Sequence, residues 1–441
     1  MPGVDVVVLG AGIAGLAAAE RLGAAGRRVV VLEARDRIGG RIHTVDDPGL
    51  NIAVELGAEF VHGRPAELVE LIRNLGLTLE AVSEDHQRGA GARAGSIGAG
   101  RRRLPDIRAS LATLLQADRA GPDRPVADLI REHAAVFARP GEVQGVIQYL
   151  EGFHAADLSR LGTRALAENE SAVDDDGDSP HRIREGYGAL VRRLAERWDH
   201  ARVEVRLGTV VTGVAWQAGQ VRVTVLASDG RTEEVVAPRV VIALPLTMVK
   251  RMVGGGSAGG LDPRPPGWVD ALGALHMGAA LRIVIGFDTR WWAPDGKPGP
   301  GFVYGGPEPF PVWWSALPAR APVLTGWAGG PRASALTGLG EAALLRAALD
   351  SLASVFGRDV AELRSRSRLA YAHDWSADPF AGGAYSYGGV GAIEARRVLT
   401  APVAGTLFLA GEAVAQHGRN ATVHGALITG REAAAAVLAQ S

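Results

Sequence analysis

The stretch "LGAGIAGL", from Leu9 to Leu16, decides the fold of this chain. Gly10, Gly12 and Gly15 have the G-x-G-x-x-G spacing. Glycines at those three places permit a tight turn, a close approach of the backbone to a pyrophosphate, and close packing of a helix on a strand. The orphan N–H groups at the start of the following helix then suit a phosphate. In a chain with 59 glycines the spacing alone is weak evidence, so its surroundings decide its meaning.

Segments on either side of these glycines follow the order that a dinucleotide-binding unit requires. Val4–Gly10 predicts a buried strand, Ala14–Gly26 predicts an alanine-rich helix, and Arg28–Arg35 predicts a second buried strand. Continuous apolar strands joined by a helix indicate a parallel sheet. Glu33, at the end of the second strand, is placed to accept hydrogen bonds from an adenosine ribose. An ordinary strand–helix turn is the alternative, but the combined pattern favours a bound dinucleotide.

The composition is that of an ordinary soluble protein with room for two or three domains. The 441 residues are 47% hydrophobic and 22% charged, and the net charge of −1 gives no indication of a nucleic-acid or membrane-surface binder. The absence of cysteine excludes disulfides, cysteine-ligated metals and a thioether-linked cofactor. No histidine pattern indicates a metal site. The N-terminus lacks a basic start and no apolar run approaches membrane-spanning length, so we expect a cytoplasmic protein.

The remainder of the chain separates into segments with clear periodic patterns. Residues 105–170 have apolar side chains at helical spacing, and residues 203–230 alternate like an antiparallel meander. Residues 239–249 predict another buried strand, which ends at a proline. The chain closes with a predicted strand at 406–412 and a predicted helix at 422–440. We see no internal repeat. The mixture of predicted helices and strands favours an α/β protein.

Three local features have plainer explanations than function. The acidic turn Asp174–Asp178 would attract a polycation but is better explained as a solvated loop. The basic run Arg101–Arg108 is best explained as a solvated loop or helix end. Ser257 has G-x-S-x-G neighbours, but it lies in a glycine-rich connection without the strand and helix that a hydrolase nucleophile requires.

At "EARDRIGGR", Glu33 to Arg41, the chain resembles the flavin-dependent amine oxidases, which comprise monoamine oxidases, polyamine oxidases and flavin-dependent histone lysine demethylases. The resemblance recurs in order along most of the chain and is weakest from about residue 90 to residue 170. Several ordered matches are more specific than any single motif. The further matching segments are "ELGAEFVHG" (55–63), "EGYGALVRRLAE" (185–196), "LGTVVTGV" (207–214), "VVIALPLTMVK" (240–250), "HMGAALRIVIGFDTRWW" (276–292), "DWSADPFAGGAYSY" (374–387), "LFLAGEAV" (407–414) and "NATVHGALITGREAA" (420–434).

The resemblance implies FAD, held by residues from the start, middle and end of the chain. Arg41 would lie by the pyrophosphate, and Glu412 would hold other donors there rather than touch phosphate. Thr422 and Val423 would begin the last helix, whose N–H groups would stabilise the reduced flavin, although a simple N-cap is also credible. The implied cofactor-binding residues are Gly10, Gly12, Ile13, Ala14, Gly15, Glu33, Ala34, Arg35, Gly39, Gly40, Arg41, Gly57, Ala58, Glu59, Phe60, Val211, Trp375, Gly411, Glu412, Thr422, Val423 and Ala426.

The resemblance also implies a substrate site in front of the flavin. Family members with a covalent flavin have a cysteine where this chain has Ala384, so the FAD should be non-covalent. Trp375 would flank the flavin, Tyr385 would form an aromatic wall, and Thr422 takes the place of the second wall. Such an apolar slot favours the neutral amine. His62 matches a histidine near the substrate amine in animal polyamine oxidases. Core packing for the aromatic residues and a structural role for His62 are the alternatives.

Arg282 is the clearest departure from the family pattern. It interrupts the apolar strand "ALRIVIGF" (280–287), where a surface or edge position is the plain explanation. The position of Arg282 resembles that of a lysine in the family, which holds a water against flavin N5 for the reaction with oxygen. Arginine keeps the charge but is larger and planar and cannot release its proton. We therefore expect Arg282 to face the flavin, and an Arg282→Lys change to accelerate reoxidation.

These observations together predict an α/β protein with two interleaved domains. A Rossmann-like FAD-binding domain would comprise residues 1–87, 183–268 and 400–441. A substrate-binding domain of mixed or antiparallel sheet flanked by helices would comprise residues 88–182 and 269–399. The flavin would lie at the interface between them.

The predicted activity is FAD-dependent amine oxidation. Hydride would pass from the amine α-carbon to flavin N5, the imine would hydrolyse, and dioxygen would be reduced to hydrogen peroxide. The alternatives are a flavin dehydrogenase, desaturase or protoporphyrinogen-oxidase-like enzyme on the same scaffold, and a non-catalytic flavin-binding protein. We expect a small-molecule amine and dioxygen as partners, no nucleic acid, no membrane and no metal, in a monomer or homodimer. The kind of amine stays open.

Overall fold

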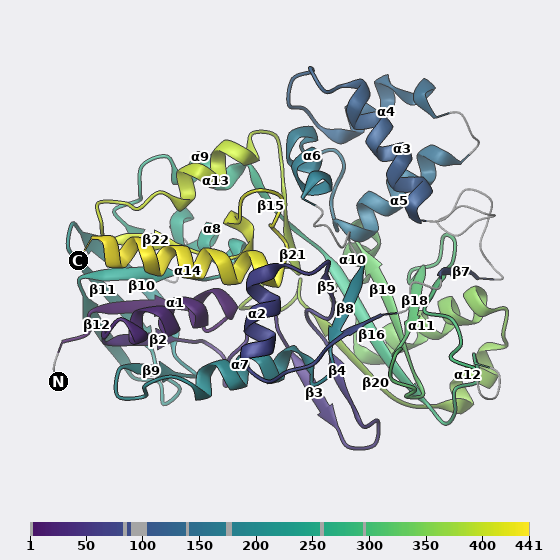
Figure 1. Cartoon of the computed structure of the whole chain (residues 1–441), viewed down its shortest axis with the longest axis horizontal. Coiled ribbons are helices and arrows are strands. Elements are labelled where there is room, and N and C mark those ends of the chain that lie inside the picture. The colour runs from purple at the N-terminus through teal and green to yellow at the C-terminus, as the bar shows by residue number, and fades with distance from the viewer. Residues whose placement is uncertain are drawn as a thin grey trace.

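The computed structural model describes residues 3–82, 86–89, 104–137, 141–172, 179–255, 260–293 and 297–440. The acidic turn Asp174–Asp178, Ser257 and most of the glycine-rich stretch that follows residue 88 lie outside these ranges. Figure 1 shows a parallel sheet with its helices on the left, a second sheet with its helices on the right, and a further group of helices above the second sheet.

A five-stranded parallel sheet forms the centre of the first part of the molecule. Its order is β22 (Leu407–Leu409), β13 (Arg239–Ile242), β1 (Val6–Leu9), β2 (Val29–Leu32) and β9 (Val203–Arg206). Every neighbouring pair is parallel. Valine and leucine fill both faces of the central strands because the sheet is covered on both sides. The predicted strand–helix–strand unit at the start of the chain is confirmed.

Helices from both ends of the chain cover one face of this sheet. In Figure 1, α14 (Val423–Ala439, yellow) lies beside α1 (Ile13–Ala24, purple). The two helices approach closely because small residues face each other. A Cβ atom at Gly430 would lie 2.1 Å from the carbonyl oxygen of Ala14. Helix α7 (Gly186–Glu196) packs into the same hydrophobic core.

The segment 203–230 is not a single antiparallel meander as its alternation predicts. Its first strand, β9, joins the parallel sheet beside β2. The other strands form an antiparallel sheet of order β12 (Thr232–Ala237), β11 (Gln220–Leu226) and β10 (Val210–Gln217), with β14 (Leu261–Asp262) at its edge. Alternation cannot distinguish these cases because β9 lies at the sheet edge and is covered on one face, so its pattern also has period two.

The buried strand predicted at the start of residues 239–249 is present and stops before the proline, as predicted. The strand β13 ends at Ile242, and helix α8 (Leu246–Gly254), which was not predicted, follows directly after Pro245. Proline disfavours helical backbone in the residue before it and is well tolerated at a helix start. Helices α8, α9 (Trp268–Gly273) and α13 (Ala392–Thr400) cover the second face of the parallel sheet, together with the antiparallel sheet.

A six-stranded sheet forms the second part. Neighbouring strands are antiparallel, except that the last two, β17 and β7, are parallel. The order is β20 (Ser367–Asp374), β16 (Ala280–Phe287), β19 (Val323–Gly329), β18 (Val312–Ser315), β17 (Phe302–Tyr304) and β7 (His86–Arg88). Strands pair with both edges of β16, and every residue of it is buried because hydrophobic clusters cover both of its faces. An edge or surface position for Arg282 is therefore wrong.

Helices cover this sheet on one side and stand above it in Figure 1. Helices α10 (Pro331–Leu336) and α11 (Glu341–Phe356) pack on its apolar face with α12 (Val360–Arg366). The predicted helical region is confirmed and contains α3 (Leu104–Ala117), α4 (Val126–Glu132), α5 (Glu142–Phe153) and α6 (Thr163–Ser171), with a short 3-10 turn at Ala134–Val136.

Short elements connect the two parts. They are β3 (Thr44–Asp47) with β4 (Ile52–Glu55), β8 (Pro180–Ile183) between β5 (Val61–His62) and β6 (Leu79–Ala81), β15 (Leu275–Gly278) with β21 (Tyr385–Gly388), helix α2 (Ala66–Asn74), and a 3-10 turn at Glu412–Val414. The fold class is α/β, as predicted. The proposed domain boundaries stay a prediction. Among the described residues, none of the helices is both long and apolar enough to cross a membrane.

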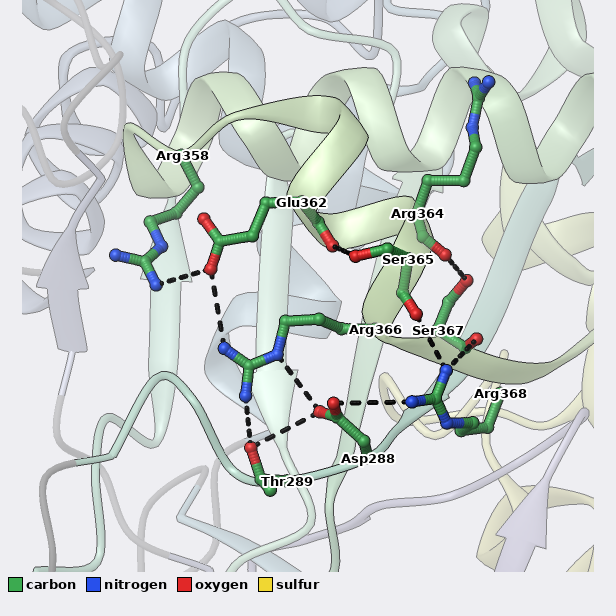
Figure 2. A network of polar contacts seen from close by, with 9 residues as sticks. All are labelled: Asp288, Thr289, Arg358, Glu362, Arg364, Ser365, Arg366, Ser367 and Arg368. Atoms are coloured by element: carbon green, nitrogen blue, oxygen red, sulfur yellow. Dashed lines mark hydrogen bonds and ion pairs between the residues drawn. The ribbon is translucent and has the colours of Figure 1, made fainter.

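A polar network fixes the outer end of β16, the strand that carries Arg282. Figure 2 shows Asp288, just beyond this strand, receiving contacts from Arg366 and Arg368 at 3.1 and 3.5 Å. Arg366 also contacts Glu362 at 3.5 Å, and Arg358 donates to the same carboxylate at 2.9 Å. The network ties β16 to helix α12 and so holds the strand's position along the sheet.

Candidate active site

A cavity of about 1850 Å³ is lined by residues from both parts of the molecule. The glycine turn after β1, the start of α14, the ends of α5 and α6, and strands of the six-stranded sheet contribute to its wall. Every predicted cofactor-binding and catalytic residue lines this cavity except Gly15. The structure therefore brings together residues that lie more than 400 positions apart in the sequence.

The three glycines of the turn have different environments. A Cβ atom at Gly10 would lie 2.9 Å from the carbonyl oxygen of Ala243, and one at Gly15 would lie 2.0 Å from that of Gly10. Gly15 thus serves the packing of α1 on β1 and does not line the cavity. A Cβ atom at Gly12 would meet nothing within 4 Å. Gly12 caps α1 without a side-chain bond, and the first turn contains no acidic residue. These features fit an anion such as a pyrophosphate.

A second glycine pair closes the turn from the other side. The N–H of Gly39 donates to the carbonyl of Ala11 at 2.8 Å, and its φ is 102°. A Cβ atom at Gly40 would lie 3.3 Å from Cα of Gly12. Backbone therefore packs against backbone at the place where Gly39 and Gly40 are predicted to approach the pyrophosphate.

Glu33 is buried at the predicted adenosine end. Its carboxylate accepts from the N–H groups of Ala11 and Arg35, at 2.8 and 2.9 Å. The Arg35 side chain forms a two-pronged ion pair with Asp378, at 2.6 and 3.0 Å. Burial would raise the pKa of Asp378, but its bond to Arg35 holds that pKa below the ordinary value. The side chains of Glu33 and Arg35 therefore have fixed orientations, as a recognition site for ribose requires.

Glu412 holds other donors, as predicted. It is buried and pairs with Arg41 at 2.7 Å, and it accepts from the hydroxyl of Ser386 and the N–H of Ala421. Burial would raise the pKa of Glu412, but Arg41 and Ser386 lower it below its ordinary value. An ionised Glu412 thus orients Arg41 in the cavity wall beside Gly57, whose Cβ atom would lie 1.8 Å from the carbonyl oxygen of Arg41.

The start of α14 also lies at the cavity. Thr422 caps this helix: its hydroxyl accepts from the N–H of Gly425 at 2.9 Å and donates to the carbonyl of Arg419 at 2.6 Å. The N-cap role is confirmed, and a role toward the flavin stays a prediction. His424 lies in the first turn and lines the cavity, and burial lowers the pKa of its imidazole to about 4. The helix start therefore presents a neutral histidine.

Tyr385 forms an aromatic wall with a partner that the sequence did not indicate. Its ring stacks on Trp327 with centroids 6.5 Å apart and planes 9° apart. The hydroxyl of Tyr385 donates to the carbonyl of Phe153 at 2.8 Å, and the indole N–H of Trp327 donates to that of Gly152 at 3.1 Å. Both rings are thus anchored to the end of α5, so the wall is rigid.

Trp375 lies on another side of the cavity and is 5% exposed. Its indole N–H donates to the carbonyl of Leu56 at 2.9 Å. The ring of His373 lies 4.1 Å from it, and His373 contacts Asp378 at 2.8 Å. Because Asp378 also holds Arg35, one carboxylate connects the predicted adenosine end with the tryptophan that is predicted to flank the flavin.

Arg282 is buried in the cavity wall and fixed from three directions. It donates to the carbonyl of Glu55 at 2.9 Å and pairs with the Glu59 carboxylate at 3.2 Å. The rings of Trp314 and Trp327 lie 5.5 and 5.7 Å from its guanidinium carbon. Cation–π contacts of this kind become stronger when water is excluded. Arg282 is therefore an oriented buried cation.

Glu59 is the carboxylate that holds this part of the wall together. It pairs with Arg182 at 2.6 Å as well as with Arg282, and it accepts from the indole of Trp314 at 3.2 Å. Burial would raise the pKa of Glu59, but the two guanidinium groups lower it below its ordinary value. Two arginines and one ionised carboxylate leave this cluster with a net positive charge beside the cavity.

His62 lines the cavity between two aromatic rings. Its imidazole lies 6.2 Å from the ring of Phe60 and 5.4 Å from that of Phe153. His62 and His424 are close enough to interact electrostatically. The position is compatible with a role near the substrate amine, and that role stays a prediction.

Several cavity residues were missed from the sequence. Trp314 and Trp327 occur in apolar strands, where a core role is the default, and α5 belongs to the region with the weakest resemblance. The missed residues that matter most are Arg108, Tyr149, Glu151, Phe153, Trp314, Trp327, Arg332 and His424. Among the described residues, no group of three histidine, aspartate or glutamate side chains could hold a metal ion.

Comparison with known proteins agrees with this geometry. A family model described as flavin-containing amine oxidoreductase matches residues 13–438. The chain belongs to this family. The chain is 27% identical to lysine-specific histone demethylase 2 of Homo sapiens over an alignment of 463 positions, which covers 97% of this chain and 53% of that protein. It is 28% identical to probable polyamine oxidase 4 of Arabidopsis thaliana over 459 residues, with coverage of 97% and 85%.

The fold of the chain also matches solved structures. Cyclohexylamine oxidase from Brevibacterium oxydans has a TM-score of 0.78 at 21% identity, and the match covers 99% of both chains. The chain spans about half the length of the lysine-specific histone demethylases that it matches.

Proposed function

We propose that the protein is an FAD-dependent amine oxidase with a non-covalently bound cofactor. The observation that carries the proposal is the continuity of the cavity, which joins the glycine turn to the aromatic wall of Tyr385 and Trp327. A dinucleotide at the first end would place its reactive ring toward the second. The chain has no cysteine, and Ala384 stands where a covalent link would form in related enzymes.

Residues of the chain would hold FAD along its length. Glu33 would accept from the adenosine ribose, and the start of α1 with Arg41 would bind the pyrophosphate. Trp375 would flank the flavin ring, and the N–H groups at the start of α14 would face its pyrimidine end. When bound, the flavin accepts a hydride and passes two electrons to dioxygen.

The reaction would convert a primary amine, water and dioxygen to an aldehyde, ammonia and hydrogen peroxide. The α-carbon loses a hydride and the nitrogen a proton, so that a C=N bond forms, and water then adds across that bond. The residues of the chain would bind and orient the amine. The aromatic wall would exclude water and favour the neutral amine, the form that can release hydride.

Arg282 supports this assignment through its charge. A fixed cation in a dry wall stabilises negative charge that develops nearby. It also disfavours a protonated amine at the same place. Arg282 and the aromatic wall would thus act in the same direction, toward a neutral amine and an electron-rich cofactor.

The test is anaerobic mixing of the holoenzyme with polyamines, monoamines and amino acids while the flavin absorbance near 450 nm is followed. We expect bleaching by at least one amine, and one equivalent of hydrogen peroxide per aldehyde when air is admitted. Bleaching without peroxide would identify a dehydrogenase on the same scaffold. Acid precipitation should release the flavin into the supernatant, and flavin that stays with the pellet would contradict non-covalent binding.

A further inference from the structure

Glu151 and Arg332 differ from the other charged residues of the cavity wall. Both line the cavity and both are half-buried. Within the described ranges, neither side chain forms a hydrogen bond or an ion pair, whereas Arg282, Arg41 and Glu412 are each paired. The two charges interact electrostatically but lie too far apart to pair with each other. Half-buried charges without partners are costly, so a ligand that pairs with them gains affinity.

The backbone fixes the places from which these two side chains extend. Glu151 lies near the end of α5, and Arg332 is the second residue of α10, which begins at Pro331 after Gly329, the last residue of β19, and Gly330. A Cβ atom at Gly329 would lie 2.3 Å from the carbonyl oxygen of Gly152, and one at Gly330 would lie 2.7 Å from that of Glu151. The two segments therefore touch without intervening side chains, which fixes the backbone positions from which the two charged side chains extend.

The same two segments carry the aromatic wall. Trp327 belongs to β19 and is bonded to the carbonyl of Gly152, and Tyr385 is bonded to that of Phe153. The charged pair and the aromatic wall are thus built on one contact between α5 and β19. A substrate that lies along the wall can reach both charges with one end.

We propose that Glu151 and Arg332 form a subsite for a zwitterionic head group, so that the substrate is a free diamino acid whose distal amine is oxidised. The substrate carboxylate would bind the guanidinium of Arg332, and its α-ammonium would bind the carboxylate of Glu151. The methylene chain would lie along Tyr385 and Trp327, and the distal amine would react. The inference rests on the proposed amine oxidase function and names its substrate class.

Burial is consistent with this assignment. It lowers the pKa of Arg332 and raises the pKa of Glu151, and in each case burial is the largest cause. Each group is therefore short of a counter-charge in the absence of a ligand. An α-amino acid supplies both counter-charges on adjacent atoms, whereas a diamine supplies one.

The first experiment compares a diamino acid with two analogues that each lack one of its charged head groups. These are L-lysine, cadaverine, which lacks the carboxylate, and 6-aminohexanoate, which lacks the α-ammonium, and the series is repeated with L-ornithine, putrescine and 5-aminopentanoate. We expect the best diamino acid to have a kcat/KM about 10- to 100-fold above that of either single-charge analogue. The aldehyde product should retain the amino-acid head by mass spectrometry.

The second experiment assigns each charge to its residue. Arg332→Gln should lower kcat/KM about 10- to 100-fold for the diamino acid and for the ω-amino acid, and less than 3-fold for the diamine. Glu151→Gln should do the same for the diamino acid and the diamine but not for the ω-amino acid. The loss should appear in KM rather than kcat, since the contacts are the same in the ground state and transition state.

Control variants remove one charge elsewhere. Arg364→Gln is the match for arginine, because Arg364 is exposed and its guanidinium has no contact drawn in Figure 2. Glu341→Gln, at the exposed start of α11, is the match for glutamate. Both should leave all six kcat/KM values within 2-fold.

The outcomes separate this inference from the function on which it rests. If diamines or monoamines bleach the flavin as well as diamino acids do, or if both variants affect all substrates alike, the head-group subsite is wrong and the amine oxidase stands. A 2-keto acid product would also overturn it, because the α-amine would then be the reacting group. If no amine bleaches the flavin, the amine oxidase proposal itself falls.

Discussion

At the scale of single residues, Gly12 and Gly15 lie in one turn but have different roles. The open space at Gly12 is where a bound pyrophosphate would approach, and the space at Gly15 is filled by the backbone of Gly10. We expect Gly12→Ala to weaken FAD binding at least 10-fold while the apoprotein keeps its melting temperature. Gly15→Ala should destabilise the apoprotein by about 3 kcal/mol or more, because its methyl group would clash with backbone. Equilibrium dialysis with FAD and thermal denaturation of the apoprotein measure the two effects.

The Gly12 and Gly15 variants also check each other. If Gly12→Ala lowered the melting temperature of the apoprotein as much as Gly15→Ala, the turn would be a purely structural feature. Normal FAD binding by Gly12→Ala would likewise mean that the glycine turn is not part of the proposed cofactor site.

Arg282 gives a second prediction at this scale. Arg282→Lys keeps the positive charge but replaces a planar group that is held by Glu55 and Glu59 with a compact ammonium that can bind water. We expect the rate constant for reoxidation of the reduced flavin by oxygen to rise about 3- to 10-fold. Arg282→Gln removes the charge, and the rate constant should fall at least 10-fold. Stopped-flow mixing of reduced enzyme with oxygenated buffer measures both, and equal rates in all three proteins would show that Arg282 has no part in the reaction with oxygen.

Glu55 makes stability depend on pH. Burial raises the pKa of its carboxyl from 4.5 to about 7. Because the folded state favours the protonated form, this contribution to stability is complete below about pH 4.5 and is lost as the pH rises through 7. The melting temperature of Glu55→Gln should therefore fall less between pH 4.5 and 7 than that of the unaltered protein. The difference corresponds to about 1–3 kcal/mol of unfolding free energy. Glu341→Gln should leave the slope unchanged, and an unchanged slope for Glu55→Gln would mean that another group titrates.

At the scale of elements, the crossing of α1 and α14 positions the cofactor cradle. Gly430 permits the contact because a side chain there would meet the carbonyl of Ala14. Gly430→Val should cost about 3 kcal/mol or more of unfolding free energy, because its side chain would clash with backbone as at Gly15, and it should weaken FAD binding, since Ala14 itself lines the cavity. Urea denaturation measures the first effect and flavin titration the second. Gly273→Ala, in helix α9 where a Cβ atom would meet nothing within 4 Å, is the control and should be neutral or stabilising.

The elements also show what periodicity can and cannot predict. The strand–helix–strand start was predictable because its strands are continuous apolar runs and its helix ends at a glycine. Pro245 likewise marked the end of the buried strand β13, but helix α8 after it was not predicted, because Leu246 to Val249 continue the apolar pattern beyond the proline. Arg282 was misleading for the opposite reason. A charged residue in a strand usually marks an exposed edge, and here Glu59 and two tryptophans from other elements make a buried position tolerable.

At the scale of the whole molecule, the cavity links both sheets, so bound flavin should stabilise them together. Removal of FAD should lower the melting temperature by several degrees, and added FAD should restore it in proportion to the logarithm of its concentration. The transition should stay a single one, because residues from both parts line the same cavity. Differential scanning calorimetry with and without flavin is the measurement. Two separate transitions in the holoenzyme, of which FAD shifts only one, would contradict this coupling.

The whole molecule also sets the limit of inference from sequence. Ordered motifs predicted most of the residues that line the cavity around the glycine turn and the start of α14, because backbone glycines and helix starts have fixed geometric requirements. The rest of the wall depends on α5, α10 and side chains such as Trp327 that have no motif. Glu151 and Arg332 are 181 positions apart, and only the contact between α5 and β19 brings them to one wall.

The pairing of α1 with α14 has a consequence for biosynthesis. About 400 residues separate the end of the first helix from the start of the last. At roughly 5–20 residues per second, the ribosome would make α14 some 20–80 s after α1 has emerged. During that interval the face of α1 that packs on α14 is uncovered, and β13 lacks its neighbouring strand β22. The nascent chain can therefore pair α1 with α14 only after α14 has been made, and until then these apolar surfaces lack their final cover.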